Sequence, residues 1–266
     1  MTNPIAAHLA AVERDRYSKS TLTNRARVLA TLPDPVGMDR LATIAWWDSR
    51  QARNDGEVRA AASLSSERAH VAEFWKWAMR EGLIDRNPAD WLPKVRQSKT
   101  MAVVVPEGDI GRLLRDADDP MRRMIALAAM AGLRSAEVAA VKWSDIDRDS
   151  GVIWIREGKG NKDRTVPLSA GLLVELGEPG EGPIIGRTMT GKAVSMAIGR
   201  YLRAHGSNFT AHKLRARYAT RFIAATGDVV AAAAVLGHSD LSSIGRYAVA
   251  SSDTMRRGAE ACGRIG

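Results

Sequence analysis

The chain has 266 residues, of which 45% are hydrophobic and 26% charged, so its composition is that of a globular protein with one or two domains. One cysteine, Cys262, excludes an internal disulfide framework and a zinc site with several cysteine ligands. A formal net charge of +9 favours a polyanionic partner such as nucleic acid.

The start of the chain lacks the basic and apolar regions of a secretory signal. The longest apolar stretch, 124–133, is about half as long as a membrane span requires. We therefore expect a soluble, cytoplasmic protein with no membrane partner.

The first third of the chain has the periodicity of helices. Apolar residues recur on one face in the segments 5–12 and 22–29, and a third helix is predicted over 65–80. Asn87-Pro88 predicts a turn that leads into a short helix. The residues expected to face inward on the third helix are Val71, Phe74, Trp75 and Ala78.

A polar and basic stretch without apolar periodicity follows this helical region. We place a linker at 96–103, between a small helical domain at 1–95 and a second domain at 104–266.

The second domain is also expected to be mostly helical. A helix is predicted to open at Pro106, and an alanine-rich helix over 122–132 must be largely buried. The apolar period then changes from 3.6 to 2 at 152–157, and 165–168 follows a basic tip, which predicts a β-hairpin. Helices are expected to resume at Thr190. The predicted fold class is therefore mainly α (α+β), with one small antiparallel sheet.

Positive charge is concentrated in one part of this domain. No Asp or Glu occurs from residue 182 to residue 227, so we expect an anion to bind there. The basic residues of this span are Arg187, Lys192, Arg200, Arg203, Lys213, Arg215, Arg217 and Arg221.

Metal and nucleotide sites find little support in the sequence. The five histidines form no HExxH pair, and there is no EF-hand loop, so we expect no metal and no cofactor. The segment 186–193 nearly matches a phosphate-binding P-loop, but Ala193 stands where Ser or Thr would hold magnesium. The ordinary interpretation is a helix capped by Thr190, with a core face formed by Val194, Ile198, Tyr201 and Leu202.

Four segments contain the other residues that could take part in a reaction. They are Ala131-Gly-Leu-Arg134-Ser-Ala-Glu137, Gly158-Lys159-Gly-Asn-Lys162, His212-Lys-Leu-Arg215, and Leu236-Gly-His238 continuing to Tyr247. In this order and at these separations they resemble the signature of the tyrosine recombinases, the phage integrase family.

The resemblance covers the chain from about residue 104 onward. The first domain is more loosely similar to the core-binding domain of the family, and the segment 75–88 is typical of the last helices of that domain. The chain departs from the family pattern at Ala211 and Ala216, where Pro and His are frequent in the family.

The resemblance implies a site-specific recombinase that cleaves and rejoins DNA through a 3′-phosphotyrosyl intermediate, without metal or ATP. Cleaving a phosphodiester in this way needs an attacking oxygen, positive charge at the non-bridging oxygens, and a proton for the leaving oxygen. The implied roles are nucleophile for Tyr247, phosphate clamp for Arg134 and Arg215, general base for His212, general acid for Lys159, phosphate hydrogen bond for His238, and brace for Glu137.

Each of these residues also has an ordinary interpretation when it is taken alone. Arg134 suits the C-terminal dipole of the preceding helix, and Glu137 suits a surface ion pair. Lys159 and Lys162 suit a solvated hairpin tip. The two histidines, His212 and His238, and Tyr247 suit ordinary structural positions. Taken together, these ordinary interpretations require six coincidences.

The resemblance also implies the partners. The two domains would close as a clamp on double-stranded attachment-site DNA, as a monomer in free solution and as a homotetramer that passes through a Holliday junction. A phage or other mobile element would use such an enzyme, and a directionality factor is a further partner. The residues expected to contact DNA are Lys94, Arg96, Lys99, Lys162, Arg164 and Lys192.

Two alternative functions remain open at this point. A type IB topoisomerase uses the same kind of nucleophile, and a catalytically silent regulator would keep only DNA binding.

The first domain begins near residue 1, so we expect no additional arm-binding domain before it. The last residues, from Ser252 or Asp253 onward, are either a short helix that docks on a neighbouring subunit or a frayed terminus.

Overall fold

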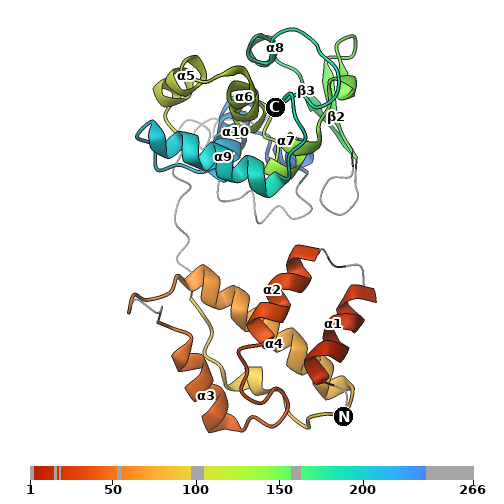
Figure 1. Ribbon diagram of the computed structural model, residues 1–266, viewed down its shortest axis with the longest axis vertical. Helices are drawn as coiled ribbons and strands as arrows, with labels where there is room; N and C mark the ends of the chain where they lie inside the picture. Colours follow the sequence, from red (N-terminus) through yellow and green to blue (C-terminus); the bar gives the residue numbers. More distant parts are fainter. Residues whose placement is uncertain are drawn as a thin grey trace, which may run out of the picture. The chain divides into compact units, whose positions relative to one another are not determined.

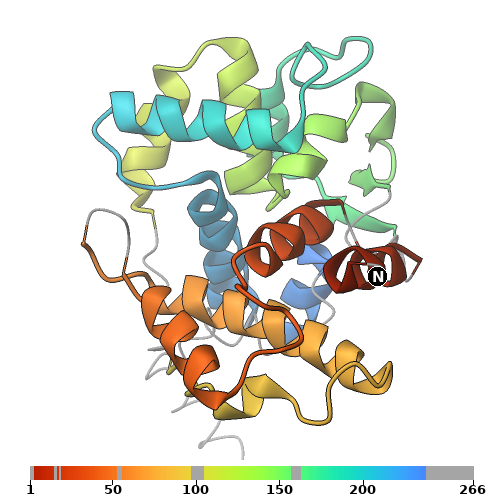
Figure 2. The ribbon, with the colours of Figure 1, turned by 60° about the horizontal axis from the view of Figure 1, so that its bottom comes forward.

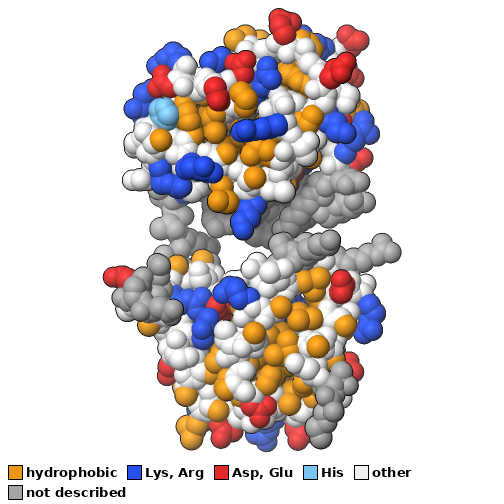
Figure 3. Space-filling model, viewed as in Figure 1, with side chains coloured by type: hydrophobic (Ala, Val, Ile, Leu, Met, Phe, Trp, Pro, Cys, Tyr) orange, Lys and Arg blue, Asp and Glu red, His pale blue; other side chains and the backbone are white. Residues whose placement is uncertain are grey.

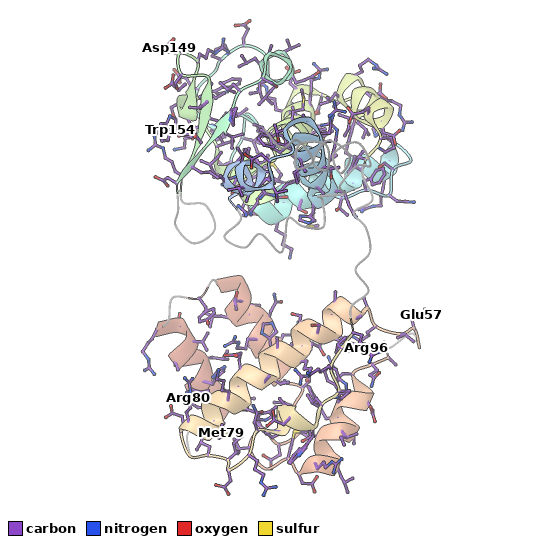
Figure 4. The ribbon with its side chains drawn as sticks, turned by 180° about the vertical axis from the view of Figure 1, so that it is seen from behind. Glu57, Met79, Arg80, Arg96, Asp149 and Trp154 are labelled. Atoms are coloured by element: carbon purple, nitrogen blue, oxygen red, sulfur yellow. The ribbon has the colours of Figure 1, made fainter. Side chains whose placement is uncertain are left out.

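The computed structural model describes residues 3–14, 17, 19–52, 56–96, 105–156 and 163–237 (Figure 1). The chain divides into two compact units, residues 1–98, here called unit 1, and residues 99–266, here called unit 2. Apart from Arg96, which is labelled in Figure 4, the linker expected at 96–103 lies outside the described residues.

Unit 1 is helical, as the sequence predicts. The third predicted helix is α4, which begins a turn earlier than expected, and its four predicted core residues are completely buried. Asn87 starts the predicted turn by accepting a hydrogen bond from the backbone N–H of Ala89 at 3.0 Å. The elements are α1 (Pro4–Arg14), α2 (Lys19–Leu29), α3 (Arg40–Ser49), α4 (Ala61–Arg80) and the 3₁₀ helix η1 (Pro88–Trp91).

The helix α3 is absent from the sequence-based prediction. Its apolar pattern is irregular, because Leu41 is exposed whereas the polar Thr43 is buried. Asp39 caps the helix by accepting a hydrogen bond from the N–H of Ala42 at 2.8 Å. Trp46 and Trp47 then pack into the core of unit 1, and this tertiary burial stabilises a helix with a weak sequence pattern.

Unit 2 is built around α6, the alanine-rich helix predicted to be buried. Its residues from Met124 to Ala129 are all at most 2% exposed, and α5, α8, α9 and α10 pack against it (Figures 1 and 2). The helices are α5 (Glu107–Arg115), α6 (Asp119–Met130), α7 (Ser135–Ala140), η2 (Trp143–Asp145), α8 (Ala170–Leu176), α9 (Gly191–Ala204), α10 (Ala211–Thr226) and α11 (Val229–Leu236).

The predicted hairpin is confirmed as two strands of a three-stranded antiparallel sheet, in the order β1-β2-β3. Ile153 pairs with Val166 and both are buried, whereas Trp154 points outward from β2 (Figure 4). The hairpin tip, 157–162, lies outside the described residues. The strands are β1 (Ile146–Asp147), β2 (Val152–Ile155) and β3 (Arg164–Pro167).

Four elements in the described part of unit 2 are absent from the prediction: α7, η2, β1 and α8. The strand β1 has two residues and α8 has seven, so neither is long enough to show a period. Helices therefore resume at Ala170 rather than at Thr190. The helix capped by Ser169 is held by the packing of Leu172 and Leu176 in the core.

The segment 186–193 is the start of α9, in agreement with the ordinary interpretation. Thr190 Oγ1 accepts a hydrogen bond from the N–H of Ala193 at 3.2 Å, and Val194, Ile198 and Leu202 are fully buried. Tyr201 is half-buried and donates its hydroxyl to the carbonyl of Leu113 at 2.9 Å. The C-terminal helix expected after Ser252 lies outside the described residues.

None of the helices that the structure describes is long and apolar enough to cross a membrane. Within the same residues, no three His, Cys, Asp or Glu side chains lie together as metal ligands would.

We predict that Gly132→Ala destabilises unit 2 more than Gly151→Ala. Both glycines have a φ of +67°, so each alanine has the same backbone strain, of order 1 kcal/mol. At Gly132 a Cβ atom would also meet Tyr218 Cδ1 at 2.6 Å and Leu236 Cδ2 at 2.9 Å, whereas at Gly151 it would meet no atom within 4 Å. We expect Gly132→Ala to lower the free energy of unfolding by about 1–3 kcal/mol more in urea titrations. Equal losses for the two variants would contradict this packing.

Candidate active site

The loop between α6 and α7 places Arg134 and Glu137 three residues apart at a helix start. Arg134 is the N-cap of α7, and the Oε2 of Glu137 accepts a hydrogen bond from the Arg134 backbone N–H at 2.7 Å. The Oε1 of Glu137 accepts a second bond from the Nη1 of Arg134 at 2.8 Å. The helix start therefore fixes both the backbone and the side chain of Arg134 against one carboxylate.

Glu137 is the centre of a cluster of three arginines. Arg164, from β3, donates from both terminal nitrogens to the two carboxylate oxygens at 2.8 Å each. Arg215, from α10, places its Nη1 at 3.6 Å from Oε2. Glu137 is only 8% exposed, so the interpretation as a surface ion-pair partner is wrong, and its position is that of a brace between distant segments.

The same three arginines also converge on the end of α11. The Nε of Arg164 donates to the carbonyl of Val235 at 2.8 Å, and the Nη2 of Arg134 donates to that of Gly237 at 2.7 Å. Arg215 donates to the carbonyl between them, on Leu236. The last carbonyls of a helix have no intrahelical donor and carry partial negative charge, so a row of guanidinium groups satisfies them.

The charges of the cluster do not cancel. Burial raises the pKa of Glu137, but the hydrogen bonds from Arg164 and Arg134 outweigh it and lower the pKa to about 2. The carboxylate is therefore ionised at neutral pH. Three guanidinium groups face one carboxylate, which leaves positive charge in excess. A further anion such as a phosphodiester suits this excess, because planar guanidinium groups bind phosphate oxygens well.

The helix α10 carries both His212 and Arg215. His212 is exposed in the first turn, and Arg215, one turn later, is buried and also donates to the carbonyl of Gly132. The two alanines that depart from the family pattern, Ala211 and Ala216, are both buried on the same helix. The structure thus brings Arg134, Glu137 and Arg215 together.

Several expected site residues lie outside the described part of the chain, and their roles stay predictions. They are Lys99, Lys159, Lys162, His238 and Tyr247.

The expected DNA-contacting residues that the structure describes differ in exposure. Lys94 and Arg96 at the end of unit 1 and Lys192 in the first turn of α9 are exposed. The side chain of Arg164 is 9% exposed, and its guanidinium group is bonded to Glu137 and Val235. This geometry does not suit the DNA contact expected for Arg164.

Part of the basic excess between residues 182 and 227 is neutralised from outside that span. Glu107, in α5, accepts hydrogen bonds from Arg217 at 2.6 and 3.0 Å and pairs with Arg221 at 3.0 Å. The expectation of an anion along the whole span is therefore wrong for these two arginines. Arg187, Lys192, Arg200 and Arg203 are exposed.

Unit 1 contains a second cluster, which the sequence analysis missed. The side chain of Glu67, in α4, is 3% exposed and pairs with Arg59 at 2.6 Å and with Arg50 at 3.2 Å. A cavity of about 340 Å³ opens beside it, and Figure 3 shows basic side chains gathered on this side of unit 1. The polar residues along its wall are Asn24, Arg27, Arg59, Ser63, Ser66 and His70.

A polar face on α4 is the signal that identifies this surface. Ser63, Ser66 and His70 recur at helical spacing, and the two serines are exposed and the histidine half-buried. Two serines and a histidine on one helix face are ordinary surface residues by themselves. They become a candidate binding surface only because Arg27 and Arg59 meet them in space.

We predict that Glu137→Gln removes a contribution to stability that depends on pH. The folded-state pKa of about 2 lies below the ordinary value of 4.5, so the contribution is full above pH 4.5 and is lost as the pH falls toward 2. Its size above pH 5 is on the order of 3 kcal/mol, at about 1.4 kcal/mol per pKa unit. Urea unfolding of both proteins between pH 7 and pH 3 measures the gap, with the exposed Glu181→Gln as control. A gap that is unchanged at pH 3 would contradict the assigned ion pairs.

Comparisons with known proteins identify relatives in sequence and solved structures of the same fold. The model of the phage integrase family matches residues 104–178. Tyrosine recombinase XerC of Yersinia pestis is 28% identical over 261 residues, which cover 89% of this chain and 86% of that protein. Tyrosine recombinase XerD of Ralstonia nicotianae is 27% identical over 243 residues, which cover 82% of this chain and 78% of that protein.

Solved structures share the fold. A lambda integrase (75–356) dimer bound to a COC′ core site has a TM-score of 0.74 at 19% identity and covers 95% of this chain and 96% of its own. The Tn1549 transposon integrase in complex with a circular intermediate DNA has a TM-score of 0.72 at 17% identity and covers 97% and 99%. The family-model match and the sequence relatives support the tyrosine recombinase family, and the solved structures share its fold.

Proposed function

We propose that this site-specific recombinase cleaves and rejoins double-stranded DNA through a 3′-phosphotyrosyl intermediate on Tyr247. The observation that supports the proposal most is the cluster of Arg134, Arg164 and Arg215 around the buried Glu137. Its excess positive charge is fixed before any substrate arrives. Charge that is preorganised in this way stabilises a phosphoryl transition state without the cost of reorganisation.

The reaction follows from the chemistry of the assigned residues. The Tyr247 oxygen attacks the scissile phosphorus, a P–O bond to tyrosine forms, and the bond to the 5′ oxygen breaks. His212 assists removal of the tyrosine proton, because the ordinary tyrosine pKa is about 10. Lys159 gives a proton to the leaving 5′ oxygen. A 5′ hydroxyl group then attacks the phosphotyrosine and rejoins the strand, so the phosphodiester energy is retained and ATP is not required.

The arginines and His238 act on the non-bridging oxygens. Arg134 is the more exposed of the two clamp arginines, and Arg215 lies behind it with its guanidinium group held by the carbonyls of Gly132 and Leu236. Gly237 is held by Arg134 and directly precedes His238 in the sequence. This proximity supports a phosphate contact for His238.

We assign the two units separate roles. Unit 1 corresponds to a core-type DNA-binding domain at 1–95, and its polar cavity, lined by Asn24, Arg27 and Ser66, suits the DNA backbone. Residues 104–266 form the catalytic domain. Exposed Lys94, Arg96 and Lys192 add phosphate contacts, as do Lys99 and Lys162.

The oligomeric state that we propose is inferred from similarity to solved integrases. One solved relative of the same fold is a lambda integrase tetramer bound to a Holliday junction. We propose that this chain is a monomer in free solution and a tetramer on synapsed attachment sites in the cytoplasm, where a directionality factor selects the direction. The segment from Ser252 onward would then dock on the neighbouring subunit.

We predict that Tyr247→Phe abolishes the covalent adduct while DNA binding stays within about twofold, because only one oxygen is lost. The substrate is a pool of nicked suicide duplexes of randomised sequence, from which the wild-type protein captures its own site covalently. The captured duplex then serves for every variant. Tyr17→Phe, in unit 1, is the matched control and keeps full activity. Cleavage by Tyr247→Phe would overturn the assignment, and absence of an adduct with the wild type would favour a silent regulator.

We predict that Lys159, rather than Lys162, supplies the proton to the leaving oxygen. Lys159→Ala should cleave the captured duplex about 10²–10⁴-fold more slowly. A 5′-bridging phosphorothioate should restore its rate, because sulfur leaves without a proton. Lys162→Ala is the control and shows no such rescue. If the sulfur substrate rescues Lys162→Ala instead, the general acid is Lys162.

A further inference from the structure

We propose that Arg164 is a positioning residue for strand cleavage, which orients Arg134 through Glu137 and fixes the end of α11, directly before His238 in the sequence. The proposal rests on the recombinase function and adds a residue to its site. It also replaces the DNA contact that the sequence suggests for Arg164.

The bonding of Arg164 excludes an ordinary role as a DNA-contacting cation. All three guanidinium nitrogens donate to protein oxygens, two to the Glu137 carboxylate and one to the Val235 carbonyl, each at 2.8 Å. The side chain is 9% exposed. Because the guanidinium group is planar and rigid, these three bonds define its orientation completely.

Arg164 determines the orientation of the Glu137 carboxylate. Each oxygen of Glu137 accepts one bond from Arg164 and one from Arg134, whose donors are the Nη1 atom and the backbone N–H. A carboxylate held by one bidentate arginine cannot rotate about its last torsion without breaking both bonds. The orientation that Arg164 imposes is therefore passed to the backbone and the side chain of Arg134.

Arg164 also fixes the end of α11. Gly237 has a φ of +62°, and a Cβ atom there would lie 3.1 Å from Arg164 Cδ, so the stem of Arg164 packs closely against this glycine. The Val235 carbonyl is held by the Nε of the same side chain. Arg134 and Arg215 bind the next two carbonyls, and His238 follows directly in the sequence. Displacement of Arg164 would therefore disturb both clamp arginines and the start of the segment that carries His238 and Tyr247.

The chain offers a matched control in Arg217. Its side chain is 11% exposed, and it bonds Glu107 through two nitrogens and the Ala129 carbonyl through the third, at 2.8 Å. The two arginines thus have the same burial and the same kinds of partner. They differ in location, because neither Glu107 nor Ala129 belongs to the arginine cluster.

The test compares Arg164→Lys and Arg164→Ala with Arg217→Lys on the duplex captured by the wild-type protein. Single-turnover adduct formation is measured at saturating DNA and well below the lowest Tm, together with Kd at several salt concentrations. We expect both Arg164 variants to lose about 10- to 100-fold in rate, by analogy with hydrogen-bond partners that orient metal ligands, whose loss has effects of this size. Arg164→Lys keeps part of the bonding and should be the faster of the two. Kd and its salt dependence should not change, and Arg217→Lys should react at the wild-type rate.

A double-mutant cycle with Glu137→Gln provides the second measurement. If Arg164 acts through Glu137, Arg164→Lys should slow the Glu137→Gln protein much less than it slows the wild type. A DNA contact would instead raise Kd and reduce the salt slope by about one.

Four outcomes would overturn the proposal. They are a wild-type rate in Arg164→Lys, an equal rate loss in Arg217→Lys, a rate effect that adds fully to that of Glu137→Gln, and a raised Kd as the main effect. Failure of the wild type itself to form an adduct would overturn the proposed function as well, so the two failures are distinguishable.

Discussion

The buried carboxylate of Glu137 is the group on which the whole candidate active site depends. A buried charge is strongly unfavourable unless opposite charges and hydrogen bonds surround it. The compensation here comes from three arginines on α7, β3 and α10, which are far apart in the sequence. The requirement to neutralise one carboxylate therefore brings together the segments that the reaction needs, and the excess of positive charge is ready for a phosphate.

At the end of α11, backbone carbonyls bind the same three arginines that surround the Glu137 carboxylate. Three consecutive carbonyls, from Val235 to Gly237, accept hydrogen bonds from the arginine nitrogens that do not bond to the carboxylate. Unit 1 contains a simpler version of the same arrangement, in which Glu67 is buried and holds Arg50 and Arg59 beside a polar cavity. In both units a buried glutamate orients basic side chains. Orientation by a buried partner lowers the entropy that an arginine would lose on binding an anion.

Much of the fold could be predicted from the sequence, because its longer helices bury regular apolar faces. The period of α4 and α6 and the change of period at β2 are local properties that sequence alone reveals. The helix α3, the helix α8 and the strand β1 could not be found in this way. They are short or irregular, and their stability comes from tertiary packing rather than from their own pattern.

The sequence by itself indicated the tyrosine recombinase family, the order of the motifs and the local pairing of Arg134 with Glu137, since residues three positions apart at a helix start lie close together. It also located the excess of basic residues, but it did not determine which of them are neutralised. Arg164 meets Glu137 across 27 positions and Val235 across 71, and Arg217 meets Glu107 across 110. Only the tertiary structure decides such pairs, because a charge is neutralised by whichever partner the packed elements bring within hydrogen-bond distance, and chain separation carries no information about that distance.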